Sequence, residues 1–138
     1  TPISFDDELK HVQNYLALEK MRFEDELEIV YDIQANDFLI PALTVQPLVE
    51  NAVKHGLGNS ENGGTVKISS RELGDCFEIE IKDNGVGFDN ENVIKSGDSH
   101  IGIENVRNRL ELSCGGTLTI ISAVGKGTTA IIKIPKEV

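Results

Sequence analysis

Alternation of apolar and polar residues is the feature that most constrains the fold of this 138-residue chain. Residues 77–82 read Phe-Glu-Ile-Glu-Ile-Lys, and residues 26–33 alternate in nearly the same way. A period of two places the apolar side chains on one face of a strand and the polar ones on the other. Further strands are expected around residues 66–68, 118–122 and 128–134. The sequence therefore predicts a sheet with one buried face.

Segments with an apolar residue every three to four positions separate these strands and predict helices. The first helix begins at Ser4, which can form a capping box with Asp7, and extends to about Met21. The second follows Thr44, which can cap it, and is expected to end at Gly56. These helices supply apolar faces that can cover the sheet.

A polar segment without periodicity, residues 88–101, precedes a third helix that starts near Ile103 and ends at Gly115. We expect this segment to be a mobile loop that acts as a lid. The order helix, strand, helix, two strands, loop, helix, two strands predicts an α+β fold: a two-layer sandwich with the helices on one face of a mixed, mostly antiparallel sheet. The length fits a single domain, residues 1–138, in which residues 1–25 form a leading helix.

The net charge of the chain argues against some classes of ligand. Thirteen basic and 23 acidic residues give a net charge of −10. This balance argues against nucleic acid or an anionic membrane surface as the ligand, because both need a positive surface. No apolar run of about 18 residues is present for a membrane span. Cys76 and Cys114 lie far apart in sequence and outside any CxxC pair, which favours reduced thiols and a cytoplasmic location.

The second predicted helix carries a polar stripe formed by Glu50, Asn51, Lys54 and His55. This stripe is compatible with a plain amphipathic helix in which Glu50 and Lys54 form a surface ion pair. However, asparagine is a poor residue for a helix interior, and its amide oxygen suits a hard cation such as Mg²⁺. A lysine one turn later supplies a positive charge for phosphate. Both interpretations stay open on this helix alone.

Asp83 follows a strand whose inward residues share its parity, so its side chain should point inward. Residues 83–88 read Asp-Asn-Gly-Val-Gly-Phe, which is compatible with a tight turn. A hairpin needs only one glycine, so Gly87 indicates that the backbone passes close to something flat or bulky. An ionised aspartate in an apolar pocket needs donors, such as the exocyclic amine of a purine.

Two further glycine motifs are weak when taken singly. Gly102 is expected to open the third helix, where free N–H groups can bind phosphate. The turn at residues 124–127 leads into the last strand, where Thr128 has inward parity and could share a hydrogen bond or a water with Asp83.

In their order and spacing the four motifs resemble the N, G1, G2 and G3 boxes of the GHKL superfamily of ATP-binding domains. Residues 47–56 and 101–110 look like the LytS/YesM type of bacterial sensor histidine kinases. The opening segment, residues 8–23, is similar to the one that joins the phosphoacceptor region of that type to its catalytic domain. The resemblance covers nearly the whole chain and implies the Bergerat ATP-binding fold.

The resemblance also implies a role for each matching residue. The expected cofactor-binding residues are Asn51, Lys54, His55, Asp83, Gly85, Gly87, Ile101, Gly102 and Thr128. Asn51 would hold Mg²⁺. The phosphates of ATP would be contacted by Lys54, His55 and Gly102, and Asp83 would accept a hydrogen bond from the adenine amine. Gly85 and Gly87 would let the backbone approach the base, and Thr128, with Thr129 as alternate, would complete the pocket. The chain departs from the pattern at His100, where the family usually carries glycine, which puts the lid geometry in question.

The implied function is the ATP-binding module of a sensor histidine kinase. The acceptor histidine is expected upstream of residue 1, because His11 lacks the family's phosphoacceptor surroundings. The implied partners are that acceptor region and a response regulator. The resemblance also implies that the full-length protein is a membrane-anchored homodimer with this domain in the cytoplasm. No membrane contact is expected for the fragment. Alternatives are a GHKL ATPase, an anti-sigma-factor type of serine kinase, or a degenerate nucleotide-binding module for protein interaction. An ATPase is disfavoured by Pro47, which stands where such enzymes place a general-base carboxylate.

Overall fold

The computed structural model describes residues 2–57, 63–85, 87 and 98–136. The elements in chain order are β1 (Pro2–Ser4), α1 (Phe5–Phe23), η1 (Glu24–Glu26), β2 (Leu27–Ile33), β3 (Leu39–Pro41), α2 (Val45–Leu57), β4 (Gly64–Glu72), β5 (Cys76–Asp83), α4 (Asp98–Cys114), β6 (Thr117–Ala123) and β7 (Gly127–Pro135). A five-stranded sheet has the order β2-β4-β5-β7-β6. The β2–β4 pair is parallel and the other pairs are antiparallel.

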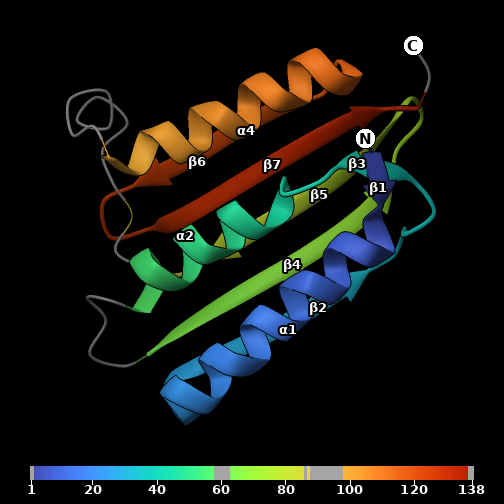
Figure 1. Cartoon of the computed structure of the whole chain (residues 1–138). Coiled ribbons are helices and arrows are strands. Elements are labelled where there is room, and N and C mark those ends of the chain that lie inside the picture. The colour runs from blue at the N-terminus through green and yellow to red at the C-terminus, as the bar shows by residue number, and fades with distance from the viewer. Residues whose placement is uncertain (1, 58–62, 86, 88–97, 137–138) are drawn as a thin grey trace.

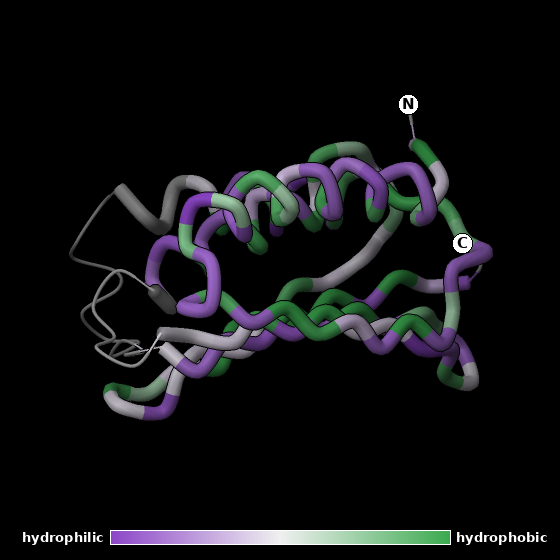
Figure 2. Tube along the Cα trace, turned by 90° about the horizontal axis from the view of Figure 1, so that it is seen from below, coloured by the Kyte–Doolittle hydropathy of each residue, from purple (hydrophilic) through white to green (hydrophobic). Residues whose placement is uncertain are grey.

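Helices α1, α2 and α4 lie side by side across one face of this sheet (Figure 1). Turned by 90°, the molecule shows a helical layer and a sheet layer, one above the other (Figure 2). The predicted α+β two-layer fold is therefore confirmed. None of the described helices is both long enough and apolar enough to cross a membrane.

Buried apolar side chains from both layers form one core. The sheet contributes alternate residues of its central strands, and the helices contribute one stripe each. The largest of these side chains, each less than 2% exposed, include Leu16, Ile68, Ile79, Ile81, Leu110 and Ile132. Phe5, Phe38 and Phe77 stack in a row at one end of the core, with centroid distances of 4.7 and 4.5 Å. The alternation that predicted strands thus identifies the buried face.

The start of α1 agrees with the predicted capping box, because the Asp7 amide donates to Ser4 Oγ at 3.1 Å. The start of α2 does not agree with prediction. The Thr44 hydroxyl donates to the Pro41 carbonyl at 2.5 Å, and the side chain that accepts from the first amides of α2 is Glu8. The helix also includes Gly56 and ends at Leu57.

Three other expectations differ from the structure. Strands β1 and β3, which pair with each other, were not predicted, because three residues are too few to show a period. Strand β4 spans Gly64–Glu72 and is therefore longer at both ends than the strand expected around residues 66–68. Helix α4 begins at Asp98, so the predicted loop does not extend to Ile101. The rest of that loop, with Phe88, lies outside the described residues.

Candidate nucleotide-binding site

The elements that carry the predicted motifs meet at one end of the molecule. The C-terminal end of α2, the end of β5, the start of α4 and the start of β7 all lie at this end (Figure 1). Strand β5 is central in the sheet, with β4 and β7 as its neighbours, so the residues that follow it emerge beneath the helical layer. The topology thus gathers segments that are far apart in sequence, from the end of α2 at Leu57 to the start of β7 at Gly127, into one region.

Helix α2 is amphipathic as predicted. Its buried stripe consists of Leu48, Val49, Ala52 and Val53, all at most 5% exposed. On the other face Asn51 and His55 are half-buried and Lys54 is exposed. In the described part of the chain no ion pair joins Glu50 to Lys54. The polar stripe is therefore not explained by a surface ion pair, and Lys54 keeps its charge available.

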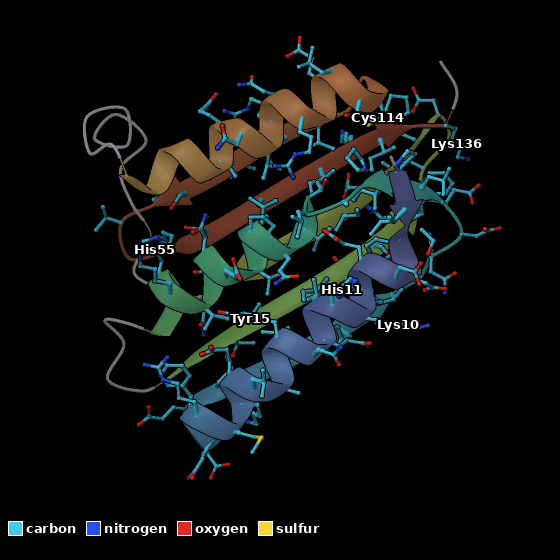
Figure 3. The ribbon with its side chains drawn as sticks, viewed as in Figure 1. Lys10, His11, Tyr15, His55, Cys114 and Lys136 are labelled. Atoms are coloured by element: carbon cyan, nitrogen blue, oxygen red, sulfur yellow. The ribbon has the colours of Figure 1, made fainter. Side chains whose placement is uncertain are left out.

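Asp83 is buried at the last position of β5, with 5% of its surface exposed. Its Oδ1 accepts from the amide of Gly85 at 2.9 Å. Burial raises the pKa of the Asp83 carboxyl, while backbone hydrogen bonds from Gly85 and Thr128 and the positive charge of His55 lower it. His55 lies at the C-terminal end of α2, on the side of the molecule where β7 begins (Figure 3). The predicted inward orientation of Asp83 is confirmed.

Asp83 belongs to a row of three polar residues across the sheet. Thr128 pairs with Asp83 in the β5–β7 register, and Ser122 pairs with Thr128 in the β6–β7 register. The Thr128 hydroxyl lies 2.7 Å from Ser122 Oγ, so its partner is Ser122, and the contact from Thr128 to Asp83 runs through the backbone. Thr129 pairs with Lys82, on the opposite face. Sequence reasoning missed Ser122, although it has the same inward parity as Leu118 and Ile120.

The glycines have a structural explanation that the sequence did not show. Gly87 has a φ of +69°, and a Cβ there would lie within 3.0 Å of backbone atoms of Ala123 and Gly127. Gly127 has a φ of +77°, and a Cβ there would overlap the carbonyl of Asp83. What passes close to Gly87 is therefore the β6–β7 turn. These two glycines fix the turn after β5 against the start of β7.

Asn84 is bound to β4, so the Asn84-Gly85 pair does not form a hairpin turn. Its side-chain oxygen accepts from the amide of Thr65 at 2.8 Å, and its own amide donates to the Thr65 carbonyl at 3.3 Å. Gly85 is buried beside it. Strand β5 pairs with β4 and β7, so among the described residues this motif does not close a β-hairpin, and Asn84 instead holds the chain to β4 where β5 ends.

The predicted position of Gly102 at a helix start is also wrong. Because α4 begins at Asp98, Gly102 lies in the second turn, where it is exposed and has no neighbour within 4 Å of an added Cβ. Ile101 precedes it within α4. Free amides at the start of α4 therefore belong to residues before Ile101.

The residues fit Mg²⁺ only with help from a bound phosphate. Among the described residues no three His, Cys, Asp or Glu side chains form a cluster that could hold a metal ion. Asn51 offers one half-buried amide oxygen on α2. Since Mg²⁺ commonly takes one or two protein oxygens and completes its six positions with phosphate and water, this donor set suits a nucleotide-bound ion.

Comparisons with known proteins agree with this geometry. Residues 37–138 match the family described as histidine kinase-, DNA gyrase B-, and HSP90-like ATPase. The chain is 34% identical over 137 residues to the sensor histidine kinase YesM of Bacillus subtilis, with 96% of this chain and 24% of YesM covered. It is 36% identical over 142 residues to the sensor histidine kinase YpdA of Escherichia coli, with 98% and 25% covered. The chain thus spans about a quarter of the length of these relatives.

Another relative, the uncharacterized protein YwpD of Bacillus subtilis, is 37% identical, with 95% of this chain and 49% of YwpD covered. Among solved structures, the catalytic domain of histidine kinase ThkA has a TM-score of 0.77 at 17% identity, with 99% of this chain and 95% of that chain covered. The mycobacterial sensor histidine kinase MprB has a TM-score of 0.71 at 18% identity, with 99% and 97% covered. The structural likeness shows the same fold, and the match over residues 37–138 shows that this chain belongs to the family of histidine kinase-, DNA gyrase B- and HSP90-like ATPases.

Proposed function

We propose that this chain is the ATP-binding module of a sensor histidine kinase, which positions Mg·ATP for phosphoryl transfer to a histidine on another segment. The observation that carries the proposal is the buried carboxylate of Asp83 at the end of a central strand, in the row that includes Thr128. The relatives YesM and YpdA, which share more than 90% of this chain's length, are sensor histidine kinases by name.

Each part of the site has a role in this proposal. The Asp83 carboxylate accepts from the exocyclic amine of adenine, and Thr128 lies beside it on the same face of the sheet. Lys54 and His55, about one turn beyond Asn51, bring positive charge to the phosphates. The start of α4, the helix that includes Ile101 and Gly102, lies at the same end of the molecule (Figure 1) and would face the phosphates. Gly85 and Gly87 shape the turn at the edge of the base.

Asn51 holds the magnesium ion through its amide oxygen. An ion held there would supply positive charge against the charge that develops on the phosphates during transfer. The chain's own residues bind and orient the nucleotide so that the attacking nitrogen and the leaving oxygen are in line. The γ-phosphorus bond to the leaving oxygen breaks as the bond to the histidine nitrogen forms, and ADP departs.

The histidine that is phosphorylated belongs to a region outside these residues. His11 is on an exposed position of α1, where acidic residues crowd the first turn. Helix α1 contributes buried side chains to the domain core. The full-length protein would be a membrane-anchored homodimer with this domain in the cytoplasm, and a response regulator would receive the phosphoryl group.

Calorimetry with Mg·ADP tests the binding step. We expect micromolar binding by the wild type and none by Asp83→Asn, because the variant presents an N–H₂ group to the adenine amine. Asp75→Asn, the same change at an exposed position beside the opposite end of β5, should bind like the wild type. Absence of binding by the wild type would refute the proposal.

Phosphoryl transfer is tested by adding labelled ATP to this chain together with a separately expressed acceptor segment. Label that appears on the segment, stable to base and labile to acid, identifies a phosphohistidine. Label released only as inorganic phosphate would favour an ATPase instead.

A further inference from the structure

Glu8 is a buried carboxylate that the proposed function does not use. It lies on α1 and is 1% exposed. Its Oε2 accepts from the amides of Thr44 and Val45, each at 2.8 Å, and from that of Gln46 at 3.4 Å. Its Oε1 accepts from the amide of Leu43 at 3.2 Å. One side chain of α1 therefore binds the free amides at the start of α2, where the helix dipole also favours a negative charge.

Arg109 of α4 contacts the same segment with the opposite polarity. Its Nη1 donates to the carbonyls of Ala42 at 3.1 Å and Leu43 at 2.5 Å. Glu8 thus accepts hydrogen bonds from the N–H groups of residues 43–46, and Arg109 donates hydrogen bonds to the C=O groups of residues 42–43. The segment before α2 is held between two side chains, Glu8 of α1 and Arg109 of α4, that lie far apart in sequence.

Leu43 shows that this segment is constrained. Its φ of +59° is in the left-handed region, which a leucine rarely adopts, and its side chain is 56% exposed. Burial of the side chain therefore does not hold the backbone in this conformation. The two charged side chains do, because Leu43 donates to Glu8 through its N–H and accepts from Arg109 through its C=O.

We propose that Glu8 and Arg109 are positioning residues that together clamp the first turn of α2 and so set the placement of the nucleotide-binding residues Asn51, Lys54 and His55. The inference rests on the proposed function for the role of those three residues. Helix α2 is a single rigid element from Val45 to Leu57, so a shift at its first turn moves Asn51 less than two turns away. Affinity for nucleotide then depends on how often the clamp is closed.

Glu8→Gln tests the clamp. The variant keeps the size of the side chain but loses the charge and one acceptor. We expect the amides of residues 43–46 to lose protection from hydrogen exchange and the Kd for Mg·ADP to rise roughly tenfold, as for a turn that is competent about a tenth of the time. Arg109→Gln should have the same two effects. The loss of affinity in the double variant should be smaller than the sum of the two single losses, because both side chains act on one segment. If Glu8→Gln does not fold, Arg109→Gln alone carries the test.

A control separates positioning from general loss of stability. Ser70 is buried, and its hydroxyl bonds to both the carbonyl and the amide of Ala35, which is outside the segment that Glu8 and Arg109 contact. Ser70→Ala should lower the melting temperature yet leave the Kd for Mg·ADP within about twofold of wild type, measured well below the melting range. Equal loss of affinity in this control would overturn the positioning role.

Rescue by glycine gives a second readout. Leu43→Gly removes the cost of the left-handed conformation, so in the Glu8→Gln background it should recover part of the lost affinity. Leu43→Ala also removes the exposed leucine side chain but keeps the cost of the left-handed conformation, so it should not recover affinity. If neither or both recover affinity, or if Glu8→Gln and Arg109→Gln bind Mg·ADP like the wild type, the inference is wrong. If the wild type itself fails to bind, the proposed function fails, and exchange at residues 43–46 still reports on the clamp.

Discussion

At the scale of single residues, Asp83 combines burial with a negative charge. Desolvation raises the pKa of its carboxyl above the ordinary value of 3.8 despite two backbone hydrogen bonds and His55. The ionised form is therefore disfavoured by folding, which is the usual cost of keeping a charge in a pocket for a ligand. This cost to stability is what we expect if the carboxylate of Asp83 binds a ligand, as proposed.

Asp83→Asn should accordingly stabilise the free protein at neutral pH, by about 1 kcal/mol, while it abolishes binding of Mg·ADP. The folded pKa is raised, so the stability associated with Asp83 is fully present below pH 3.8 and is lost as the pH rises through the folded pKa. The variant lacks this dependence. Thermal unfolding of both proteins across pH should show the variant's advantage shrinking as the pH falls toward 3.8, and an advantage that grows instead would contradict the assignment.

Asn51 should separate metal from base recognition. Because we assign its amide oxygen to Mg²⁺ alone, Asn51→Ala should remove the Mg²⁺ dependence of ADP affinity and lower phosphoryl transfer by about 100-fold or more, with metal-free ADP bound nearly as before. Titration of ADP with and without Mg²⁺ measures this. Glu50→Gln, at the exposed neighbouring position, is the control and should leave both affinities unchanged. Loss of metal-free binding in Asn51→Ala would show that Asn51 contacts the nucleotide itself.

At the scale of elements, the turn between β6 and β7 packs closely against the end of β5. Gly127 and Gly125 have similar φ values of +77° and +80°, but only Gly127 faces backbone that an added Cβ would overlap. Gly127→Ala should therefore cost more than about 3 kcal/mol, and Gly125→Ala only about 1 kcal/mol, as expected for the left-handed conformation alone. Urea unfolding of the two variants provides the comparison. Similar costs for both would mean that the turn can move away from Asp83.

Sequence periodicity predicted the elements but not their polar connections. Alternation was sufficient to place Asp83 and Thr128 on the inner face, because parity within a strand is a local property. The contact of Glu8 with Thr44 joins positions 36 residues apart, and on α1 a glutamate in the first turn is expected to face solvent as part of an acidic cap. Gly87 was assigned to a ligand because its neighbour, the β6–β7 turn, is distant in sequence. The contacts of such residues depend on packing between segments that are distant in sequence, which a local pattern does not show.

At the scale of the whole molecule, most of the excess acidic residues lie on the edge strand β2 and on the helices next to it, whereas the candidate site lies nearer the centre of the sheet. Residues 1–40 contain ten acidic and three basic side chains, and they form α1, η1 and the edge strand β2. The candidate site lies where β5 ends and β7 begins, and in our proposal Lys54 and His55 supply positive charge there. A net charge of −10 is therefore compatible with a compact anionic ligand, although it opposes binding of an extended polyanion.

This distribution predicts opposite effects of salt on the free and the nucleotide-bound protein. Raising NaCl from about 20 to about 300 mM shortens the screening length to well below the size of the domain. Self-repulsion among the acidic residues of α1, η1 and β2 then weakens, and the melting temperature of the free protein should rise by roughly 2–4 °C. The further rise produced by Mg·ADP should become smaller, because salt also screens Lys54 and the phosphates. Replacing Asp25 and Glu26 of η1, both exposed, by Asn and Gln should raise the low-salt melting temperature and reduce its response to salt while leaving the Mg·ADP increment intact. A variant that instead changes the increment would mean that the field of the acidic region reaches the nucleotide, and the two regions would have to be treated as one.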